Sequence, residues 1–594
     1  MRYLPYSIRE NIKIKLKTCL CSIHWQASLI FNVYYFSQNM KRISGFLLHL
    51  LIAFAAVTTS ATGQTVVKAK NTTLARPKLV VGIVVDQMRY DYLYRYYDKY
   101  KEGGLKRLMN EGFNCRNNHY HYALTVTAAG HSAVYTGALP AVNGIVGNDW
   151  YDKSKASNVY CTEDKTVATV GSSNVTVGKM SPRNLLTTTV TDQLRIATNF
   201  RSKTIGVAIK DRASILPAGH AANGAYWFDS KTGNFVSSTY YGNELPQWVQ
   251  DYNNKKMPSE YLRRGWNTLL PIEQYTQSSP DDVPWEGTLS GAAKPIFPHE
   301  LIGTAGDAFG VITTSPWGNT MTKEMAIAAI KGENMGKGTD TDFLAVSFST
   351  PDRIGHAFGP NSVEQEDNYL KLDMEFADLF NFLDSWTGKG NYTVFLTADH
   401  GAMDVPAFWQ EHKLPAGLMN PTTLTRTIVK SLNDALGEGE YVQAFENYQL
   451  YLNNALLKEK KLSIEDVYKV LREALIPVQG IADVINLTDI GRAPLNTYQL
   501  ELYKNNINAK RSGDIQVIVQ PGWFASSYGT GTDHGTPYNY DTHVPFLLYG
   551  WGVNKGETLR RTTIADIAPT ISALLHILPP SGNVGNPVEE ALKK

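Results

Sequence analysis

The 594-residue sequence lacks several features that would place it in a simple structural class. It has no internal repeat and no low-complexity tract, and none of its apolar runs approaches the roughly twenty residues that a membrane span needs. Cysteine is scarce, with four residues in all, while hydrophobic residues make up 43% of the chain and charged residues 19%. These values exclude collagen, a coiled coil, a disordered chain and a disulfide scaffold, so a large hydrophobic core must stabilise the protein.

An excess of positive charge is also missing. The chain has 57 Lys and Arg residues against 55 Asp and Glu residues, for a net charge of +2. Residues 1–63 hold seven basic residues and one acidic residue, which leaves a net charge of −4 for the remainder. Recognition of nucleic acid needs a basic face, and we therefore exclude nucleic acid as a partner.

Residues 40–63 have the layout of a secretory signal peptide. A Lys-Arg pair precedes an apolar run of twelve residues, which is interrupted by His49 and followed by a small-residue segment. The run is short for a membrane anchor, so we favour a removed signal over an uncleaved one and expect a periplasmic or otherwise exported protein without a stable membrane span. Residues 1–39 resemble no domain and are interpreted as an upstream extension that translation can omit, which leaves 64–594 as the catalytic body.

The predicted export bears on the cysteines. Cys19 and Cys21 lie ahead of the signal, so the mature chain would keep only Cys115 and Cys161. An oxidising compartment permits a disulfide. We predict one between these two residues.

Apolar, β-branched runs recur along the body and predict buried strands at 78–85, 204–209, 343–348, 393–397, 515–519 and 545–549. Amphipathic helical patterns lie between them, most clearly at 364–384 and again near 464–475. This alternation predicts an α/β fold, with a doubly wound, mostly parallel sheet flanked by helices and with ligands outside the carboxyl ends of the strands. Two segments, 213–340 and 403–512, fit the alternation poorly and are interpreted as insertions that cap the strand ends.

Polar residues follow the predicted strands where the apolar runs stop: Asp86, Lys210 with Arg212, Asp352 with His356, Asp399 with His400, and His534. One such residue is usually a turn or a helix cap, but a doubly wound sheet would bring the whole set to one edge. Asp352 and His356 are one helical turn apart and would share a face. Gly401 lets the chain turn directly after Asp399 and His400.

Three Asp and three His residues suit a pair of divalent ions. Carboxylate and imidazole ligands together favour Zn²⁺ over Mg²⁺, and we predict two Zn²⁺ per chain. Two ions about 4 Å apart can stabilise the attacking and the leaving oxygen of an in-line displacement. Phosphoryl transfer is the reaction that uses this arrangement.

Thr127 is the candidate nucleophile. It is predicted to be the N-cap of a helix that begins at Ala128, where free backbone N–H groups attract a phosphate and a metal could lower the pKa of the hydroxyl. A threonine that only caps the helix stays open as the alternative on these residues alone.

Lys210, Arg212 and Asn148 are candidates for phosphate binding. The two basic residues follow a strand at i and i+2, so both can project to one side, as one point charge and one planar fork. Asn148 lies in a Gly-Asn-Asp turn. A solvated basic pair and a plain turn residue are the alternatives.

Seven motifs occur in order along the chain: Val-Val-Asp86-Gln, Thr127-Ala-Ala-Gly-His, Gly-Asn148-Asp-Trp, Lys210-Asp-Arg212, Asp352-Arg-Ile-Gly-His356, Thr-Ala-Asp399-His400-Gly and Asp-His534-Gly-Thr. With this set the sequence, from about residue 78 to 578, resembles the alkaline phosphatase superfamily, and most closely the exported, phosphate-irrepressible (PafA-type) alkaline phosphatases of Bacteroidota.

The resemblance implies a role for each matching residue. It implies one zinc ion held by Asp352, His356 and His534. It implies a second zinc ion held by Asp86, Asp399 and His400, with the oxygen of Thr127. Asn148, Lys210 and Arg212 would hold the phosphoryl oxygens.

The sequence therefore predicts a zinc-dependent alkaline phosphatase that hydrolyses small-molecule phosphate monoesters through a phosphothreonine. A phosphodiesterase or nucleotide pyrophosphatase of the same superfamily is the nearest alternative. A surface module that binds glycans or phosphorylated ligands through its 33 Tyr and 11 Trp residues is the alternative from another class. A sulfatase is disfavoured because no Cys/Ser-x-Pro-x-Arg sequence is present. We expect a monomer, and the natural substrate is not indicated.

Overall fold

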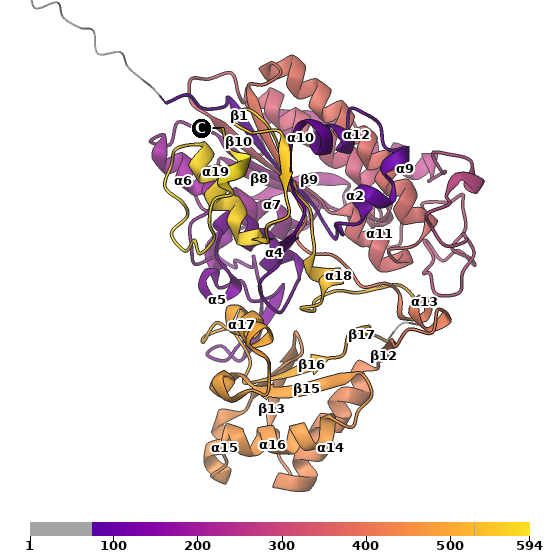
Figure 1. The fold of residues 1–594 in the computed structure, drawn as a ribbon, viewed down its shortest axis with the longest axis vertical. Helices are drawn as coiled ribbons and strands as arrows, with labels where there is room; N and C mark the ends of the chain where they lie inside the picture. Colours follow the sequence, from indigo (N-terminus) through magenta and orange to yellow (C-terminus); the bar gives the residue numbers. More distant parts are fainter. Residues whose placement is uncertain (1–73, 528, 594) are drawn as a thin grey trace, which may run out of the picture. The chain divides into compact units, whose positions relative to one another are not determined.

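A mixed sheet of ten strands organises the part of the chain that this computed structural model describes, residues 74–527 and 529–593 (Figure 1). The strand order is β19-β2-β18-β11-β1-β10-β7-β8-β9-β6. The five neighbours from β11 to β8 are parallel, and antiparallel pairs flank them on both sides. The strands are β1 (Leu79–Val85), β2 (Phe113–Cys115), β6 (Thr169–Val170), β7 (Thr204–Ala208), β8 (Gly224–Asp229), β9 (Asn234–Ser238), β10 (Asp342–Phe348), β11 (Tyr392–Thr397), β18 (Phe546–Gly550) and β19 (Gly556–Thr558).

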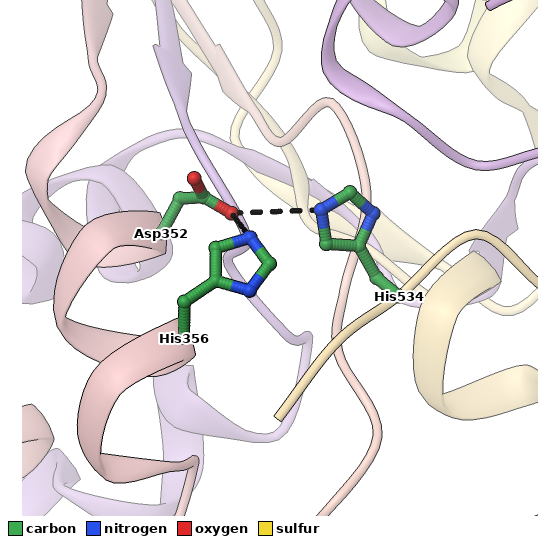
Figure 2. A group of neighbouring side chains, drawn as sticks. All are labelled: Asp352, His356 and His534. Carbon is green, nitrogen blue, oxygen red and sulfur yellow. Dashed lines mark ion pairs between the residues drawn. The ribbon is translucent and has the colours of Figure 1, made fainter. Parts of the chain in front are cut away.

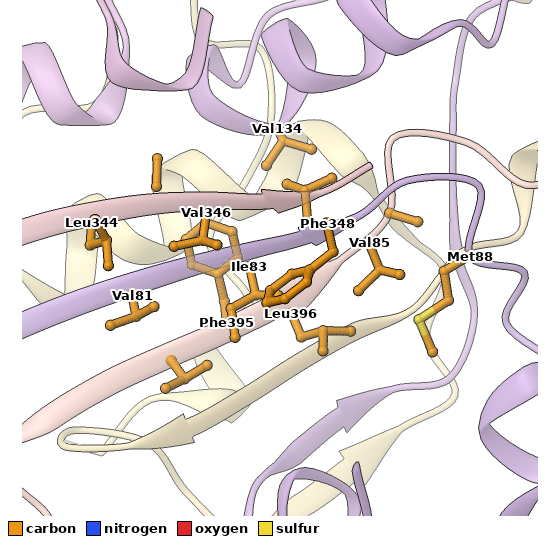
Figure 3. Packing of buried hydrophobic residues seen from close by; sticks show 14 of the residues in the cluster. Val81, Ile83, Val85, Met88, Val134, Leu344, Val346, Phe348, Phe395 and Leu396 are labelled. Carbon is orange, nitrogen blue, oxygen red and sulfur yellow. The ribbon is translucent and has the colours of Figure 1, made fainter. Parts of the chain in front are cut away.

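Strand β1 lies at the centre of this sheet. All seven of its residues are buried, as the continuous apolar run predicts for a strand covered on both faces. Ile83 pairs with Val346 of β10 and with Leu396 of β11 (Figure 3). Full burial of such a side chain contributes about 1.5–3 kcal/mol to the stability of the fold. Packing of these side chains therefore fixes the register of each strand relative to its neighbours.

Helices cover the sheet in two groups, which Figure 1 shows on opposite sides of it. One group contains α4 (Thr127–Thr136), α6 (Val190–Ala197), α7 (Asp211–Ala218) and α19 (Ile567–Leu574). The other contains α8 (Gln247–Asn254), α10 (Trp317–Gly332), α11 (Thr350–Phe358) and α12 (Val363–Thr387). The predicted doubly wound α/β fold is thereby confirmed, and α12 is the helix predicted at 364–384.

A second, four-stranded sheet lies outside the main one, in the order β13-β14-β16-β15. Its strands are β13 (Val442–Glu446), β14 (Gln449–Leu452), β15 (Ile481–Asn486) and β16 (Ile515–Val519). Helices α14 (Pro421–Leu436), α15 (Asn454–Lys460) and α16 (Ile464–Leu475) share a separate hydrophobic cluster with it. We call residues 421–519 the inserted subdomain; α16 is the helix predicted near 464–475.

The remaining strands form three two-stranded sheets, β12-β17, β20-β3 and β4-β5. The remaining strands are β3 (Asn118–His119), β4 (Asp149–Asp152), β5 (Ser157–Tyr160), β12 (Gly417–Met419), β17 (Trp523–Ala525) and β20 (Thr562–Thr563). The other α-helices are α2 (Tyr92–Arg95), α3 (Leu105–Glu111), α5 (Pro140–Asn143), α9 (Met257–Arg264), α13 (Pro406–Glu411), α17 (Thr497–Asn506) and α18 (Asn539–Thr542).

The structure confirms the strand predicted at 545–549 as β18, which is antiparallel to β11, and it corrects three other sequence expectations. The run at 515–519 is β16 of the second sheet, because it pairs with β14 and β15, and the inserted subdomain therefore continues past the predicted end at 512. The predicted insertion at 213–340 is narrower, since β8 and β9 pair in the main sheet and α10 packs on it.

Two further predictions lie outside the described residues: the upstream extension and the signal peptide. Within the described ranges, no helix combines the length and the apolar character that crossing a membrane requires.

The predicted disulfide is wrong. Cys115 and Cys161 are both free and buried. Cys115 lies on β2 in the main core, whereas Cys161 follows β5 and belongs to a small separate cluster with Trp150 and Val159. Each thiol is held in its own apolar environment instead of facing the other.

We expect both thiols to be protected in the folded protein and free after denaturation. Burial raises the pKa of the Cys115 thiol to about 12 and raises that of Cys161 as well, so little of the reactive thiolate forms at neutral pH. Iodoacetamide labelling without a reductant, followed by peptide mass spectrometry, should show both cysteines modified in denaturant and neither in the native state. Recovery of a linked Cys115–Cys161 peptide would contradict the structure.

Candidate active site

The carboxyl ends of four adjacent parallel strands carry predicted site residues at one edge of the sheet. Asp399 follows β11, Asp86 follows β1, Asp352 lies on α11 after β10, and Lys210 follows β7. Loops at this edge of a doubly wound sheet form the usual ligand-binding crevice. His534 arrives at the same edge because the antiparallel β18 begins opposite the end of β11.

Asp352, His356 and His534 form one candidate metal group (Figure 2). The Nε2 atoms of His356 and His534 lie 3.0 and 3.7 Å from Asp352 Oδ1. The Nδ1 atoms of the two rings lie 2.9 Å from the carbonyl oxygen of Thr532 and 2.7 Å from that of Thr125. Such backbone partners fix the ring tautomers and leave both Nε2 atoms available as ligands.

Asp86, Asp399 and His400 form the second group, and all three side chains are fully buried. The Nε2 atom of His400 lies 3.5 Å from Asp86 Oδ1 and 3.6 Å from Asp399 Oδ2. None of these three atoms has a hydrogen-bond partner in the protein. An unsatisfied buried polar atom costs about 1–3 kcal/mol, so this donor set fits a bound cation.

Asp86 and Asp352, one carboxyl group from each candidate metal group, have pKa values that are shifted in opposite directions. Burial, together with repulsion from Asp352 and Asp399, raises the pKa of Asp86 well above its usual value. Burial acts in the same direction on Asp352, but attraction to His356 and Lys210 holds its pKa well below the usual range. Lys210 Nζ lies 2.7 Å from Asp86 Oδ2 and 2.6 Å from Asp352 Oδ2, and so links the two groups.

The pKa values of the two histidines in the first group are shifted in opposite directions. Burial and repulsion from His400 and His356 lower the pKa of His534 to about 3, so its ring is neutral at pH 7. For His356 burial acts to lower the pKa, but the attraction of Asp352 outweighs it and raises the value to about 9. A metal ligand must be a neutral imidazole, so metal binding would displace a proton from His356.

Thr127 is the first residue of α4. The N-cap is Val126, whose own side chain makes no capping hydrogen bond, so the predicted N-cap position of Thr127 is wrong by one residue. Its hydroxyl oxygen lies 3.4 Å from both Lys210 Nζ and Arg212 Nη2. Two cations converge on this oxygen at a helix N-terminus, which is an arrangement that attracts a phosphate.

Lys210 and Arg212 reach Thr127 by a route other than the predicted strand alternation. Lys210 is the N-cap of α7, and Arg212 lies in its first turn. Arg212 Nη1 donates a hydrogen bond of 3.1 Å to the hydroxyl of Tyr160, which itself donates one of 2.7 Å to Asp211. This chain of hydrogen bonds orients the guanidinium group.

Asn148 lies directly before β4, and its Oδ1 accepts a hydrogen bond of 2.9 Å from the backbone N–H of Ala128. The residue is therefore held at the start of α4. Loop, turn and helix residues near the ends of both sheets line a cavity of about 280 Å³ around Thr127. It is lined by Leu124, Val126, Thr127, Asn148, Lys210, Arg212, Asp352, His356, Asn447, Tyr448, Asp533 and His534.

Sequence reasoning assigned no role to several residues of this site, among them His131, Gln87, Asn447 and Tyr448. The buried ring of His131 has its Nδ1 atom 2.9 Å from the Thr127 carbonyl oxygen and 3.3 Å from Asp399 Oδ2. The backbone N–H of Gln87 donates to Asp399, and its side-chain amide donates to Asp352. His131 and Gln87 both lie within the seven ordered motifs of the sequence, and this position was the signal that could have identified them.

The other two residues missed are Asn447 and Tyr448, which line the cavity from the inserted subdomain. No motif surrounds them in the sequence. They lie between β13 and β14, which are distant in sequence from the other site residues. The sequence offered no signal for them.

Comparisons with known proteins extend over most of the chain. The sequence pattern of the family described as type I phosphodiesterase / nucleotide pyrophosphatase matches residues 80–543. Alkaline phosphatase PafA of Elizabethkingia meningoseptica is 48% identical over 88% of this chain and 96% of its own. Alkaline phosphatase PhoV of Synechococcus elongatus is 47% identical over 88% of this chain and 94% of its own.

Solved structures agree with these sequence matches. The crystal structure of wild-type PafA superposes with a TM-score of 0.84 and covers 88% of this chain and all of its own. A crystal structure of a PafA variant, in which one threonine, one asparagine, one lysine and one arginine are replaced, superposes equally well. The chain therefore belongs to the type I phosphodiesterase / nucleotide pyrophosphatase family and, within it, to the group that includes the alkaline phosphatase PafA.

Proposed function

We propose that the protein is an exported, zinc-dependent alkaline phosphatase that hydrolyses small phosphate monoesters and releases inorganic phosphate. The observation that carries the proposal is the position of the Thr127 hydroxyl oxygen. It lies at the start of α4, 3.4 Å from the cationic ends of Lys210 and Arg212, in a cavity that Asp352, His356 and His534 also line. A hydroxyl in this position can attack a phosphoryl group held by its neighbours.

The reaction would proceed in two displacements at phosphorus. In the first, a bond forms between Thr127 Oγ1 and phosphorus while the bond from phosphorus to the alcohol oxygen breaks, and the threonine hydroxyl proton passes to the departing alcohol, which gives a phosphothreonine and a free alcohol. In the second, a water oxygen attacks the same phosphorus and the threonine oxygen leaves with a proton. Lys210, Arg212 and Asn148 would hold the non-bridging oxygens as negative charge develops on them, and charge-assisted hydrogen bonds of this kind are the strong ones.

Two divalent ions, proposed to be zinc, fit the two donor groups. One would be held by Asp352, His356 and His534, and the other by Asp86, Asp399 and His400 with the Thr127 oxygen. When bound, such ions supply Lewis-acid stabilisation of the attacking and leaving oxygens and lower the pKa of a water molecule. Lys210 would stay between Asp86 and Asp352 and offset part of their charge.

The relatives support this assignment. Both PafA and PhoV are named alkaline phosphatases, and their similarity covers the catalytic body. The four residues replaced in the PafA variant have the same spacing along that chain as Thr127, Asn148, Lys210 and Arg212 have here. Export of the protein is proposed on the sequence of residues 40–63 alone.

A phosphodiesterase is the second candidate, because the family description includes that activity. A diester presents two non-bridging oxygens and one negative charge, and its second substituent would lie where Lys210 and Arg212 converge. A monoester presents three oxygens and two charges. Two cations directed at the Thr127 oxygen therefore favour the monoester.

Activity should depend on metal. EDTA should abolish hydrolysis of an aryl phosphate, and mass spectrometry of the active protein should find roughly two zinc ions per chain. Asp399→Ala should remove most of the activity, because it deletes a buried ligand. Asp434→Ala, which removes an exposed carboxylate on α14, is the matched control and should leave the rate unchanged. Full activity of metal-free protein would refute the mechanism.

Thr127 should behave as a nucleophile. Thr127→Ala should lower kcat more than about a thousandfold, which corresponds to about 4 kcal/mol, whereas Thr127→Ser should keep substantial activity because the attacking oxygen survives. Thr136→Ala, at the other end of α4, should leave kcat within about twofold and only cost stability, since it removes the hydrogen bonds of the Thr136 hydroxyl with Ser132 and Ala138, worth about 1 kcal/mol each. Near-normal activity of Thr127→Ala would show that the residue is structural.

Lys210 and Arg212 should determine the preference for monoesters. The double change Lys210→Ala/Arg212→Ala should lower kcat/KM for a monoester by about a hundredfold or more, about 3 kcal/mol, and that for a diester much less. Arg201→Ala/Lys203→Ala, a basic pair at the opposite end of β7, is the control and should change neither. Equal loss of both activities would assign the pair a structural role or indicate disturbed metal sites.

A further inference from the structure

The lining of the 280 Å³ cavity divides by chemistry into three parts. Four residues face the phosphoryl group in the proposed reaction: Thr127, Asn148, Lys210 and Arg212. Three form a candidate metal group: Asp352, His356 and His534. The remaining wall consists of Leu124, Val126, Asn447, Tyr448 and Asp533. Any part of the alcohol that lies inside the cavity would face this remaining wall.

Asn447 and Tyr448 form the tip of the hairpin between β13 and β14. Glu446 pairs with Gln449, so the loop has two residues, and their φ angles are 55° and 59°. This is the geometry of a type I′ turn, which strongly prefers glycine at its second position. A tyrosine in the left-handed region is unfavourable there. Residues kept in such conformations cluster at ligand-binding sites.

Hydrogen bonds hold this tip in place. The side-chain amide of Asn447 donates to the carbonyl oxygen of Asp149 at 2.7 Å. The Tyr448 carbonyl oxygen accepts from the backbone N–H of Val517 at 2.8 Å, and its hydroxyl accepts from that of Ala525 at 2.8 Å. The Tyr448 side chain also packs partly against the hydrophobic cluster of the inserted subdomain, so it lines the cavity as a half-buried aromatic residue.

We propose that the Asn447–Tyr448 tip is the subsite for the alcohol portion of the ester, and that it favours flat, uncharged aromatic alcohols. Leu124, Val126 and the Tyr448 ring supply an apolar wall, and aromatic rings pack well on one another. The Asp533 side chain is 46% exposed and adds a negative charge that disfavours a second anionic group. A cavity of this size is at the lower end for small-ligand sites, which suits a single ring.

This inference rests on the proposed phosphatase function and names its substrate class. Benzyl phosphate and ethyl phosphate are suitable probes, because both are monoesters of alkyl alcohols and differ in the ring. Inorganic phosphate, used as a competitive inhibitor, reports on the phosphoryl site alone. The unmodified protein should prefer benzyl phosphate to ethyl phosphate, and also to 4-carboxybenzyl phosphate.

Tyr448→Gly suits the turn geometry and removes the ring. It should lower kcat/KM for benzyl phosphate about tenfold, that for ethyl phosphate less than twofold, and leave the inhibition constant of phosphate within twofold. Lys461→Gly replaces another left-handed residue of the inserted subdomain that does not line the cavity, and it should change none of the three values. Tyr448→Phe keeps the ring and should keep the preference, and Tyr448→Asn serves if the glycine variant does not fold.

Equal losses for the two esters, or a parallel weakening of phosphate inhibition, would overturn the subsite, because the tip would then act on the phosphoryl site or on folding. The subsite would also be overturned if every Tyr448 variant kept the same preference for benzyl phosphate over ethyl phosphate as the unmodified protein. If the unmodified protein hydrolysed neither ester and bound no phosphate, the proposed function itself would fail. The alcohol subsite would then be refuted as well, but by the absence of hydrolysis and of phosphate binding in the unmodified protein.

Discussion

Mutual repulsion of three buried carboxylates is the constraint on which the site depends. Asp86, Asp352 and Asp399 are all at most 2% exposed and lie at one edge of the sheet. At an effective dielectric constant of 20, two unit charges about 5 Å apart repel by about 3 kcal/mol, and the raised pKa of Asp86 reflects this repulsion after burial. Lys210 is the one lysine or arginine among the described residues that forms ion pairs with two of these carboxylates. It cannot balance all three alone, and the protonated ring of His356 offsets part of the charge of Asp352. Divalent cations bound to the two donor groups would take over that role when they displace the His356 proton.

The rigid centre of the sheet makes this arrangement possible. Strand β1 is buried along its whole length, and its register with β10 and β11 is continuous, so the residues that follow these strands have little freedom to move apart. Helix α4 approaches the same edge closely. A Cβ atom on Gly130 would lie 2.1 Å from the backbone oxygen of Asp399, so only glycine permits this contact. Gln87 adopts a φ of 65° and donates hydrogen bonds to Asp352 and Asp399, which stores local strain where the site needs fixed carboxylates.

The sequence allowed prediction of the fold and of the residues that share the sheet edge, because buried parallel strands and polar strand ends both leave local patterns. Helical spacing placed Asp352 and His356 on one face, and both are on α11. Other features depend on tertiary contacts and left no pattern. β16 has the composition of a core strand, and its assignment to the second sheet depends on its partners β14 and β15. The separation of Cys115 and Cys161 likewise depends on which hydrophobic cluster each one joins.

The inserted subdomain is joined to the phosphoryl site by a short series of contacts. Asn447 donates a hydrogen bond to the carbonyl oxygen of Asp149, and the preceding residue, Asn148, accepts one from the N–H of Ala128 in the first turn of α4. One side chain of the hairpin tip therefore contacts the segment that positions a phosphate-binding candidate, while its neighbour Tyr448 lines the cavity itself. These two hydrogen bonds place the hairpin tip directly beside the segment that carries Asn148. The candidate sites for the alcohol and for the phosphoryl group are therefore neighbours in one cavity, although the residues that form them come from segments of two separate sheets.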